Sequence, residues 1–349
     1  MGPMLSFLVI ALLCGCAGLL VLVRFPAVAT APPTPAPIRV SVIIPARNEA
    51  HNLPALLGSL ASQPVKPCEI LVVDDASTDG TAETARRLGA RVIASAPLPE
   101  GWRGKTWACH QGAEAAVGGW FLFLDADTAF EPDGLGRVLA SYPGGAFSIV
   151  PYHAVQNGYE DLSLFFNLNM IAGTGRHGLF GQMLLVDRES YRRAGGHAAV
   201  RGRILENLAL ASEFRAAGVP VQSELGRGMF SFRMYPHGLR ELVEGWTKGF
   251  ASGAGQTPPS VMILIVAWMA GLVLAPVGWL GTGDWRHWGA AFGIGVAQVR
   301  WFGRKVGAFG WGSAVLYPVP LLFFFGVFAW SAARSGRPVR WKGRAIRAD

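Results

Sequence analysis

The 349-residue sequence contains few charged residues and few cysteines. Asp, Glu, Lys and Arg make up 15% of it, against the roughly 25% of an ordinary globular domain, so an ordinary soluble protein is excluded. Its four cysteines, at positions 14, 16, 68 and 109, show neither zinc-ligand spacing nor a disulfide framework, and so few thiols are compatible with the cytoplasm. No basic patch interleaved with aromatic residues is present, so the net charge of +8 predicts no nucleic-acid partner.

Long uncharged runs are concentrated at the two ends of the chain. They are Met4 to Val23, Val261 to Gly281 and Val306 to Ala333. Each is about as long as the ~20 residues that cross a bilayer as a helix. We therefore predict a transmembrane anchor over residues 1–24, a Pro-rich linker over 25–37, a C-terminal transmembrane region over 256–333 and a basic tail over 334–349.

The charges beside the first run predict its orientation. No Lys or Arg precedes it, whereas Arg24 and Arg39 follow it, which places the central domain in the cytoplasm. The alternative is a cleaved signal peptide, since Ala27-Val28-Ala29 resembles a cleavage site.

The number of C-terminal spans stays open between two and three. Two spans return the basic tail to the cytoplasm but leave Arg300, Arg304 and Lys305 outside, and a third span over Trp288 to Val299 reverses both placements. We expect a multi-pass protein of the cell membrane with its tail inside and an interfacial or re-entrant middle piece.

Residues 38–255 read as one α/β domain. Short β-branched or apolar runs predict buried strands at Val40–Ile44, Ile70–Val73, Arg91–Ala94 and Phe121–Leu124. Helical stretches lie between them, at Asn52 to Leu60 with Asn52 as its cap and at Ala82 to Leu88. This alternation predicts a mostly parallel sheet with helices on both faces.

The second half of this domain is less regular. We expect an antiparallel strand at Gln182–Val186 and a helix at Ile204–Ala217 that Gly218 ends. The stretch from His237 to Phe250 mixes charged and apolar residues directly before a predicted span, which favours an interfacial helix. An ordinary surface helix of the domain is the alternative.

Two carboxylates follow the apolar run Trp120 to Leu124. Asp125 and Asp127 would lie at the carboxyl edge of the sheet, where open α/β sheets bind ligands. Two hard oxygen donors there suit Mg²⁺ or Mn²⁺ bound to a diphosphate. The alternative is an Asp-rich turn without a ligand.

Two further strand ends and one loop carry polar motifs. They are Pro45-Ala46-Arg47-Asn48-Glu49, Asp74-Asp75-Ala76-Ser77-Thr78-Asp79-Gly80-Thr81 and the loop Gly101-Trp102-Arg103-Gly104-Lys105-Thr106-Trp107-Ala108. With Asp125-Ala126-Asp127, the two strand-end motifs resemble the family-two inverting glycosyltransferases of GT-A (Rossmann-like) fold.

That resemblance implies a UDP-sugar site. Its residues would be Pro45, Ala46, Arg47, Glu49, Asp74, Asp75, Lys105 and Asp125, with Asp127 and Asp125 as the metal ligands. A carboxylate suits uracil because it accepts the imide N–H, and a lysine can neutralise the diphosphate. Turn formation, which we expect of Asp79, is the alternative for the Asp74/Asp75 pair, and a flexible basic loop is the alternative for Lys105.

Further motifs resemble one carotenoid-pathway subfamily. They are Pro151-Tyr152-His153, Gly195-Gly196-His197, Phe232-Arg233-Met234-Tyr235, Glu244-Gly245-Trp246-Thr247-Lys248, Gly253-Ala254-Gly255 and Trp341-Lys342-Gly343-Arg344. Members attach glucose to the carboxyl end of a C30 carotenoid acid. The resemblance implies UDP-glucose as donor and an apolar lipid acid as acceptor.

The acceptor side departs from the family pattern at Leu205-Glu206-Asn207, where many relatives carry Glu-Asp with the Asp as general base. A hydroxyl acceptor needs such a base, whereas a carboxylic acid is already ionised at neutral pH. We hypothesise that Asn207 reflects a carboxylate acceptor. The competing hypothesis makes Glu206 the base for a lipid hydroxyl.

A bound carboxylate needs a cation, and the candidates are His153, Arg233 and Lys248. Trp246 is a candidate for stacking on the acceptor, or alternatively a membrane-interface residue. The sequence thus predicts a membrane-bound glucosyltransferase that forms a glycosyl ester. The alternatives are transfer to a polyprenyl phosphate or hopanoid, and a catalytically inactive membrane scaffold.

Overall fold

The structure, a computed structural model, describes residues 9, 15–21, 39–203, 205–253, 257–333, 339–341 and 344–346. The predicted linker and most of the predicted anchor and basic tail lie outside these residues, as do residues 254–255 of the Gly-Ala-Gly motif.

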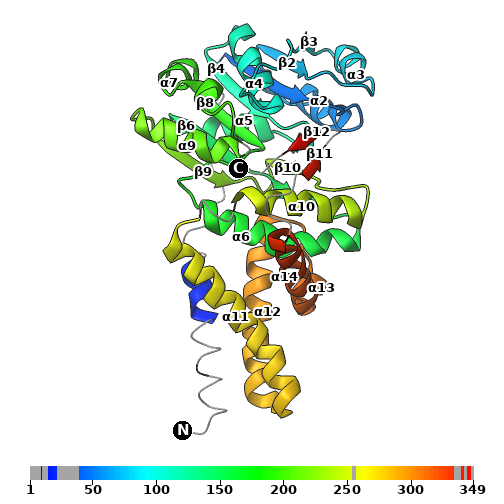
Figure 1. Cartoon of the computed structure of the whole chain (residues 1–349), viewed down its shortest axis with the longest axis vertical. Helices are drawn as coiled ribbons and strands as arrows, with labels where there is room; N and C mark the ends of the chain where they lie inside the picture. Colours follow the sequence, from blue (N-terminus) through cyan, green and yellow to red (C-terminus); the bar gives the residue numbers. More distant parts are fainter. Residues whose placement is uncertain are drawn as a thin grey trace.

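A seven-stranded sheet forms the centre of the main domain, with strand order β3-β2-β1-β4-β8-β6-β9 (Figure 1). The first four in chain order are β1 (Val40–Ala46), β2 (Glu69–Asp74), β3 (Arg91–Ala94) and β4 (Trp120–Leu124), and they are parallel to one another. The predicted antiparallel strand is β8 (Met183–Asp187), which pairs with β4 and with β6 (Ala146–Val150). The remaining edge strand, β9 (Val221–Leu225), runs parallel to β6, so the predicted mostly parallel sheet is confirmed.

Helices cover both faces of this sheet, as predicted. One face packs on α2 (Leu53–Ala61), α3 (Thr81–Arg87) and α5 (Gly134–Ser141). The other packs on α4 (Gly104–Ala115), α7 (Arg188–Arg193), α8 (Gly196–Ala199) and α9 (Glu206–Ala216). Along β1, Val42 and Ile44 face the first layer and Ile43 faces the second, because side chains alternate along a strand.

The prediction that Asn52 caps α2 with its side chain is wrong. Asn52 does occupy the position before Leu53, but its side chain makes no capping hydrogen bond. Its Nδ2 instead donates to Glu49 Oε2 at 2.8 Å, so the amide stabilises the preceding turn.

A second sheet of three strands links the site to the rest of the chain. It contains β5 (Thr128–Phe130), β10 (Phe230–Phe232) and β7 (Tyr152–His153) in the order β5-β10-β7. Its pairing places Thr128, Phe232 and His153 in one row, and an isolated bridge adds Gly307 beyond His153.

Helices α6 (Leu164–Thr174) and α10 (Leu239–Gly253) lie below the sheet (Figure 1). They pack against η1 (Gly158–Ser163) and α14 (Pro318–Ala333), and α13 (Trp311–Val315) precedes α14 in the chain. The predicted interfacial helix is α10, which begins at Leu239 rather than His237. Its buried Leu242 and Trp246 belong to the same core as α6 and α14.

The helices α11 (Pro259–Thr282) and α12 (Trp285–Val306) form a hairpin that extends away from the sheet (Figure 1). Residues 15–21 are helical and lie beside it, where Gln298 Nε2 donates to the Gly15 carbonyl. Among the described residues, α11 is the one helix whose length and composition suffice to cross a membrane. The predicted middle piece, residues 288–299, is the middle of α12 and packs along α11.

The uncharged run over residues 306–333 is divided in the structure and does not form one continuous helix. Gly310 precedes α13, and Pro318 starts α14 after a turn at Leu316–Tyr317, since a residue before proline is disfavoured in a helix. Ser313 Oγ donates to Asp161 of η1, and Ser331 Oγ donates to the Thr247 carbonyl of α10. The segment therefore starts and ends against the main domain, and the tail that follows contains the hairpin of β11 (Val339–Trp341) and β12 (Arg344–Ile346).

Candidate active site

The three polar strand ends predicted to meet do lie side by side, because β2, β1 and β4 are neighbours in the sheet. Ala46 at the end of β1 pairs with Asp74 at the end of β2, and the amide of Asp75 donates to the Ala46 carbonyl at 2.8 Å. The carboxyl ends of parallel strands form the ligand-binding edge of such a sheet.

The turns after β1 and β2 hold each other through hydrogen bonds. Arg47 Nη1 donates to the Asp75 carbonyl at 2.6 Å, and Asn48 Oδ1 accepts from the Thr78 amide at 2.9 Å. Asn48 has a φ of 54°, in the left-handed region that asparagine tolerates. Asp79 accepts from the amides of Ala50 and Thr81, which confirms that this carboxylate builds the turn.

Three of the residues predicted to contact the nucleotide form hydrogen bonds within the protein. The buried Glu49 accepts from Asn52, and Asp74 Oδ1 accepts from the Ser77 amide at 3.3 Å. Asp75 is buried, and its backbone carbonyl accepts from Arg47. Their contacts to a base or ribose stay predictions.

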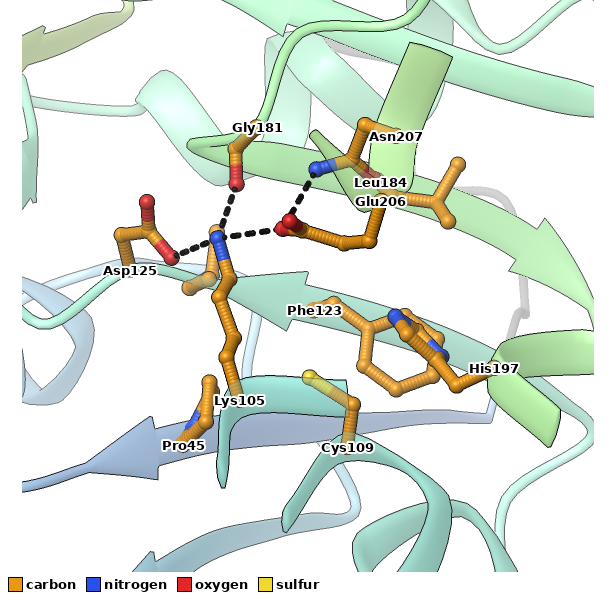
Figure 2. Close-up of a pocket in the computed structure, with 11 residues that line it drawn as sticks. Pro45, Lys105, Cys109, Phe123, Asp125, Gly181, Leu184, His197, Glu206 and Asn207 are labelled. Atoms are coloured by element: carbon orange, nitrogen blue, oxygen red, sulfur yellow. Dashed lines mark hydrogen bonds and ion pairs between the residues drawn. The ribbon is translucent and has the colours of Figure 1, made fainter. Parts of the chain in front are cut away.

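Lys105 lies at the centre of the site, where all three of its N–H groups have acceptors (Figure 2). Its Nζ is 2.7 Å from Asp125 Oδ1, 2.8 Å from Glu206 Oε1 and 3.0 Å from the Gly181 carbonyl. Burial lowers the pKa of Lys105, but the carboxylates of Asp125 and Glu206 outweigh it and hold this pKa well above the usual value. The ammonium group therefore stays charged and links the metal-ligand candidate to the acceptor side.

Glu206 and Asn207 begin α9 and are both buried. Asn207 Nδ2 donates to Glu206 Oε1 at 3.2 Å, so the oxygen that pairs with Lys105 also accepts from the amide. This oxygen of Glu206 is therefore engaged by two donors within the site.

The donor set offered to a metal ion is Asp125 and Asp127. No group of three or more His, Cys, Asp or Glu side chains that could hold a metal is found in the described part of the chain. Magnesium and manganese sites in phosphate-transfer proteins commonly use one or two carboxylates and complete their shell with phosphate oxygens and water. Asp125 and Asp127 fit such a shared site, and do not by themselves form a closed cage.

A small pocket lies beneath Lys105, with a volume of about 10 Å³, room for about one water molecule. Its lining residues Cys109, Gly181 and Leu184 carry no sequence motif that predicts a site. A fourth lining residue, His197, belongs to the Gly195-Gly196-His197 motif. Burial lowers the pKa of His197 to about 3, so this imidazole is neutral and contributes no charge.

The candidate acceptor residue His153 is fully buried. Its Nδ1 lies 2.8 Å from Asn167 Nδ2, and its ring contacts those of Phe232 and Phe309. Burial lowers the pKa of His153 to about 4, although Glu160 opposes this effect. His153 is therefore uncharged at neutral pH, and the prediction that it supplies a cation is wrong.

The second candidate cation, Arg233, already has a counter-ion. Its Nη2 and Nε lie 2.8 and 3.1 Å from Oε1 of the buried Glu160. Although burial acts to raise the pKa of Glu160, hydrogen bonds from Gln156, Arg233 and Asn157 hold it below the usual value. Arg233 thus compensates a buried carboxylate rather than facing the site as a free cation.

The two remaining acceptor candidates lie on α10. Trp246 is buried, donates from Nε1 to Ser163 Oγ at 3.1 Å and stacks on Phe166, so it packs between helices instead of presenting its ring to an acceptor. The backbone of Lys248 is helical, and its side chain lies outside the described residues.

Comparisons with known proteins agree with this geometry. The description Glycosyl transferase family 2 matches residues 41–208. Proteins named 4,4'-diaponeurosporenoate glycosyltransferase from Staphylococcus aureus strains USA300 and MRSA252 are 33% and 34% identical over 329 residues, 87% of this chain and of each relative. Among solved structures, the mannosyltransferase PcManGT from Pyrobaculum calidifontis in complex with GDP-Man and Mn²⁺ covers 94% of this chain and 98% of its own. Its TM-score is 0.53 at 19% identity, which shows a shared GT-A-like fold.

Proposed function

Because the chain belongs to Glycosyl transferase family 2 and is a hexosyltransferase, we propose that it moves glucose from UDP-glucose to the carboxylate of an apolar lipid. The product is a glycosyl ester, and a carotenoid acid is the acceptor suggested by the name of the Staphylococcus relatives. The observation that carries this choice of acceptor is the contact of Glu206 with Lys105 and Asn207.

The reaction needs no proton removal from such an acceptor. A carboxylic acid with a pKa near 4 to 5 is ionised at neutral pH. One carboxylate oxygen forms the new bond to the anomeric carbon as the bond from that carbon to UDP breaks, and UDP leaves with the electron pair on the opposite face. Attack from the face opposite the leaving group inverts the anomeric centre.

Glu206 is poorly suited to be the base that a hydroxyl acceptor requires. Its Oε1 already accepts from both Lys105 and Asn207, so this oxygen is engaged within the site and is not directed at an acceptor hydroxyl. Asn207 itself cannot take a proton at neutral pH. Both features support an acceptor that arrives already charged.

The donor site consists of the turns after β1 and β2 together with the end of β4. Pro45, Ala46, Arg47, Glu49, Asp74 and Asp75 would surround uracil and ribose. Asp125 and Asp127 would hold Mg²⁺ or Mn²⁺ on the diphosphate. That ion would act as a Lewis acid on the departing UDP. The Mn²⁺ of the Pyrobaculum neighbour supports this assignment.

Lys105 would change partners when the donor binds. Its ammonium group neutralises Asp125 in the present state, and a diphosphate at the same strand end offers it stronger acceptors. A different cation would then orient the acceptor carboxylate, because His153 is neutral and Arg233 is paired with Glu160. Lys248 remains the candidate for that role.

A membrane location fits an acceptor that does not dissolve in water. The helix α11 is 24 residues long and uncharged, and exposed Ile263, Val266 and Leu280 lie on it. A multi-pass arrangement with a cytoplasmic active site, an N-terminal anchor over residues 1–24 and a stiff linker over 25–37 belongs to the same proposal.

Mass spectrometry of lipids from cells that express the protein and receive a carotenoid acid tests the proposal. We expect a hexose ester of that acid, absent from cells with Asp127→Ala. A hexosylated polyprenyl phosphate or hopanoid in place of the ester would contradict the carboxylate acceptor. The absence of any new hexosylated lipid, with no UDP released from UDP-glucose by the membranes, would indicate an inactive scaffold.

A further inference from the structure

The end of α12 nearest the main domain carries three cations, Arg300, Arg304 and Lys305. None of them forms an ion pair within the part of the chain that the structure describes. The Nε of Arg300 is buried without a hydrogen-bond partner among these residues, and its Nη1 reaches the Phe309 carbonyl only at 3.4 Å. A partly buried cation without a counter-ion is costly, so this position is suited to an anion from outside the chain.

Two exposed tryptophans accompany these cations. The Lys305 ammonium group lies 4.0 Å from the ring centre of Trp301, and the Arg300 guanidinium lies 5.4 Å from that of Trp311. The exposed fractions of the tryptophans are 43% and 64%. Tryptophan paired with a long basic side chain is typical of the level of lipid headgroups, where an apolar ring and a charged group are both accommodated. We call Arg300, Trp301, Arg304, Lys305 and Trp311 the α12 rim.

Exposed apolar side chains lie on the helices that neighbour α12 and on the segment that follows. They are Ile263 and Val266 of α11, Leu316 directly after α13, and Val319 and Leu322 of α14. The next charged groups along α12 are at its far end, where the Asp284 side chain accepts from the amides of Arg286 and His287. Arg286 and Arg300 are about 21 Å apart at 1.5 Å per helical residue, and the stretch between them is apolar or uncharged.

The helix dipole does not account for the whole arrangement. Arg304 and Lys305 in the last turn are favourable at a helix C-terminus. The dipole gives no reason for the orphaned Nε of Arg300 or for two exposed tryptophans with cations over their rings. Both features are expected where a phosphate group meets the rim.

We propose that the α12 rim binds the phosphate of an anionic phospholipid in the bilayer, and that this contact sets the depth of the α11–α12 hairpin. The charge of the rim is complementary to that headgroup, and the exposed apolar side chains of α11 and α14 are complementary to acyl chains. Phospholipid binding at the α12 rim requires neither the sugar donor nor a metal ion, so it can be tested independently of the transfer reaction.

The rim also lies close to the active site. Thr128, next to Asp127, pairs with Phe232, and Phe232 pairs in turn with His153. His153 forms a bridge to Gly307, the residue directly after α12. Three strand spacings of about 4.8 Å place Gly307 roughly 14 Å from Thr128. A headgroup on the rim therefore brings the bilayer surface within reach of the metal-ligand candidates.

The test uses the full-length protein in a neutral detergent, titrated with dioctanoyl phosphatidylglycerol or dioctanoyl phosphatidylcholine and followed by native mass spectrometry. We expect retention of phosphatidylglycerol and little retention of phosphatidylcholine. The double variant R304Q/K305Q should weaken phosphatidylglycerol binding about 30-fold, since each cation near a lipid surface contributes on the order of 1 kcal/mol. The matched control R192Q/R193Q removes two exposed charges from α7 and should change nothing.

A charge-preserving variant, R304K/K305R, separates loss of binding from loss of folding and should retain phosphatidylglycerol. Equal binding of the two lipids by the native protein would overturn the proposal, as would equal losses in the two Gln double variants. Displacement of the lipid by inorganic phosphate at matched concentration would also overturn it, because the site would then recognise free phosphate.

Discussion

The ammonium nitrogen of Lys105 lies 2.7 Å from Asp125 Oδ1 and 2.8 Å from Glu206 Oε1, so one cation joins the donor side and the acceptor side of the site. Asp125 follows β4, and Glu206 starts α9, which packs on one face of the sheet. Without Lys105 the two carboxylates would face each other across the pocket without compensation.

Lys105→Met should lower kcat/KM for UDP-glucose by about 10²–10³-fold, because it removes the positive charge offered to the diphosphate. Steady-state kinetics with purified full-length protein measures the effect. Lys66→Met, at an exposed position where the ammonium group donates to the Ala61 carbonyl, is the control and should leave kcat/KM unchanged. Similar activity in the two variants would show that Lys105 serves folding alone.

Glu206→Gln should reduce transfer to a carboxylic acceptor by less than about tenfold, because that acceptor needs no base. If Glu206 were instead the base for a lipid hydroxyl, the same variant would abolish transfer to a hydroxyl acceptor of similar chain. Parallel assays with a lipid acid and the corresponding lipid alcohol make the comparison. Near-complete loss with the acid would establish Glu206 as a base and contradict the proposed acceptor chemistry.

Arg233→Gln should lower the free energy of unfolding by about 3 kcal/mol, because it leaves the buried Glu160 without its counter-ion. Thermal unfolding in detergent measures the loss. The double variant Arg233→Gln/Glu160→Gln should recover much of it. The control Arg240→Gln breaks an exposed pair with Glu244 and should stay within about 0.5 kcal/mol. An unchanged stability with a raised KM for the acceptor would return Arg233 to the acceptor site.

Acidification from pH 6.5 to about 4 should destabilise the protein through His153. Burial lowers the pKa of His153 to about 4 in the folded state from its ordinary 6.5, so between these values the unfolded chain binds a proton that the folded chain does not. Stability is therefore complete above pH 6.5 and falls as the pH drops, by roughly 3 kcal/mol for this residue. His153→Gln should show a shallower acid slope in unfolding measured against pH. Equal slopes would contradict the burial of a neutral imidazole.

Much of the sheet and its ligand edge was predictable from the sequence. Strong local patterns marked β1, β2, β3 and β4, and Asp125-Ala126-Asp127 directly follows such a strand. The antiparallel β8 and the stop of α9 at Gly218 were also predictable, since Gly218 has a φ of 70° that favours glycine.

The state of individual charges was not predictable in this way. Both His153 and Arg233 have residue types suited to binding a carboxylate, yet one is neutral through burial and the other is paired with Glu160, 73 positions away. The bond of Lys105 to the Gly181 carbonyl and the bridge of His153 to Gly307 join segments that no local pattern relates. Such contacts depend on the tertiary packing of distant segments.

Calorimetric titration of UDP into the purified full-length protein, with and without Mn²⁺, tests the donor site most directly. We predict binding that requires Mn²⁺ and disappears in Asp127→Asn. It should persist in the control Asp133→Asn, where the φ of 59° suits asparagine equally well. Equal UDP binding with and without Mn²⁺, or equal binding by the native protein and Asp127→Asn, would contradict a divalent ion held by these two carboxylates beneath a UDP-sugar.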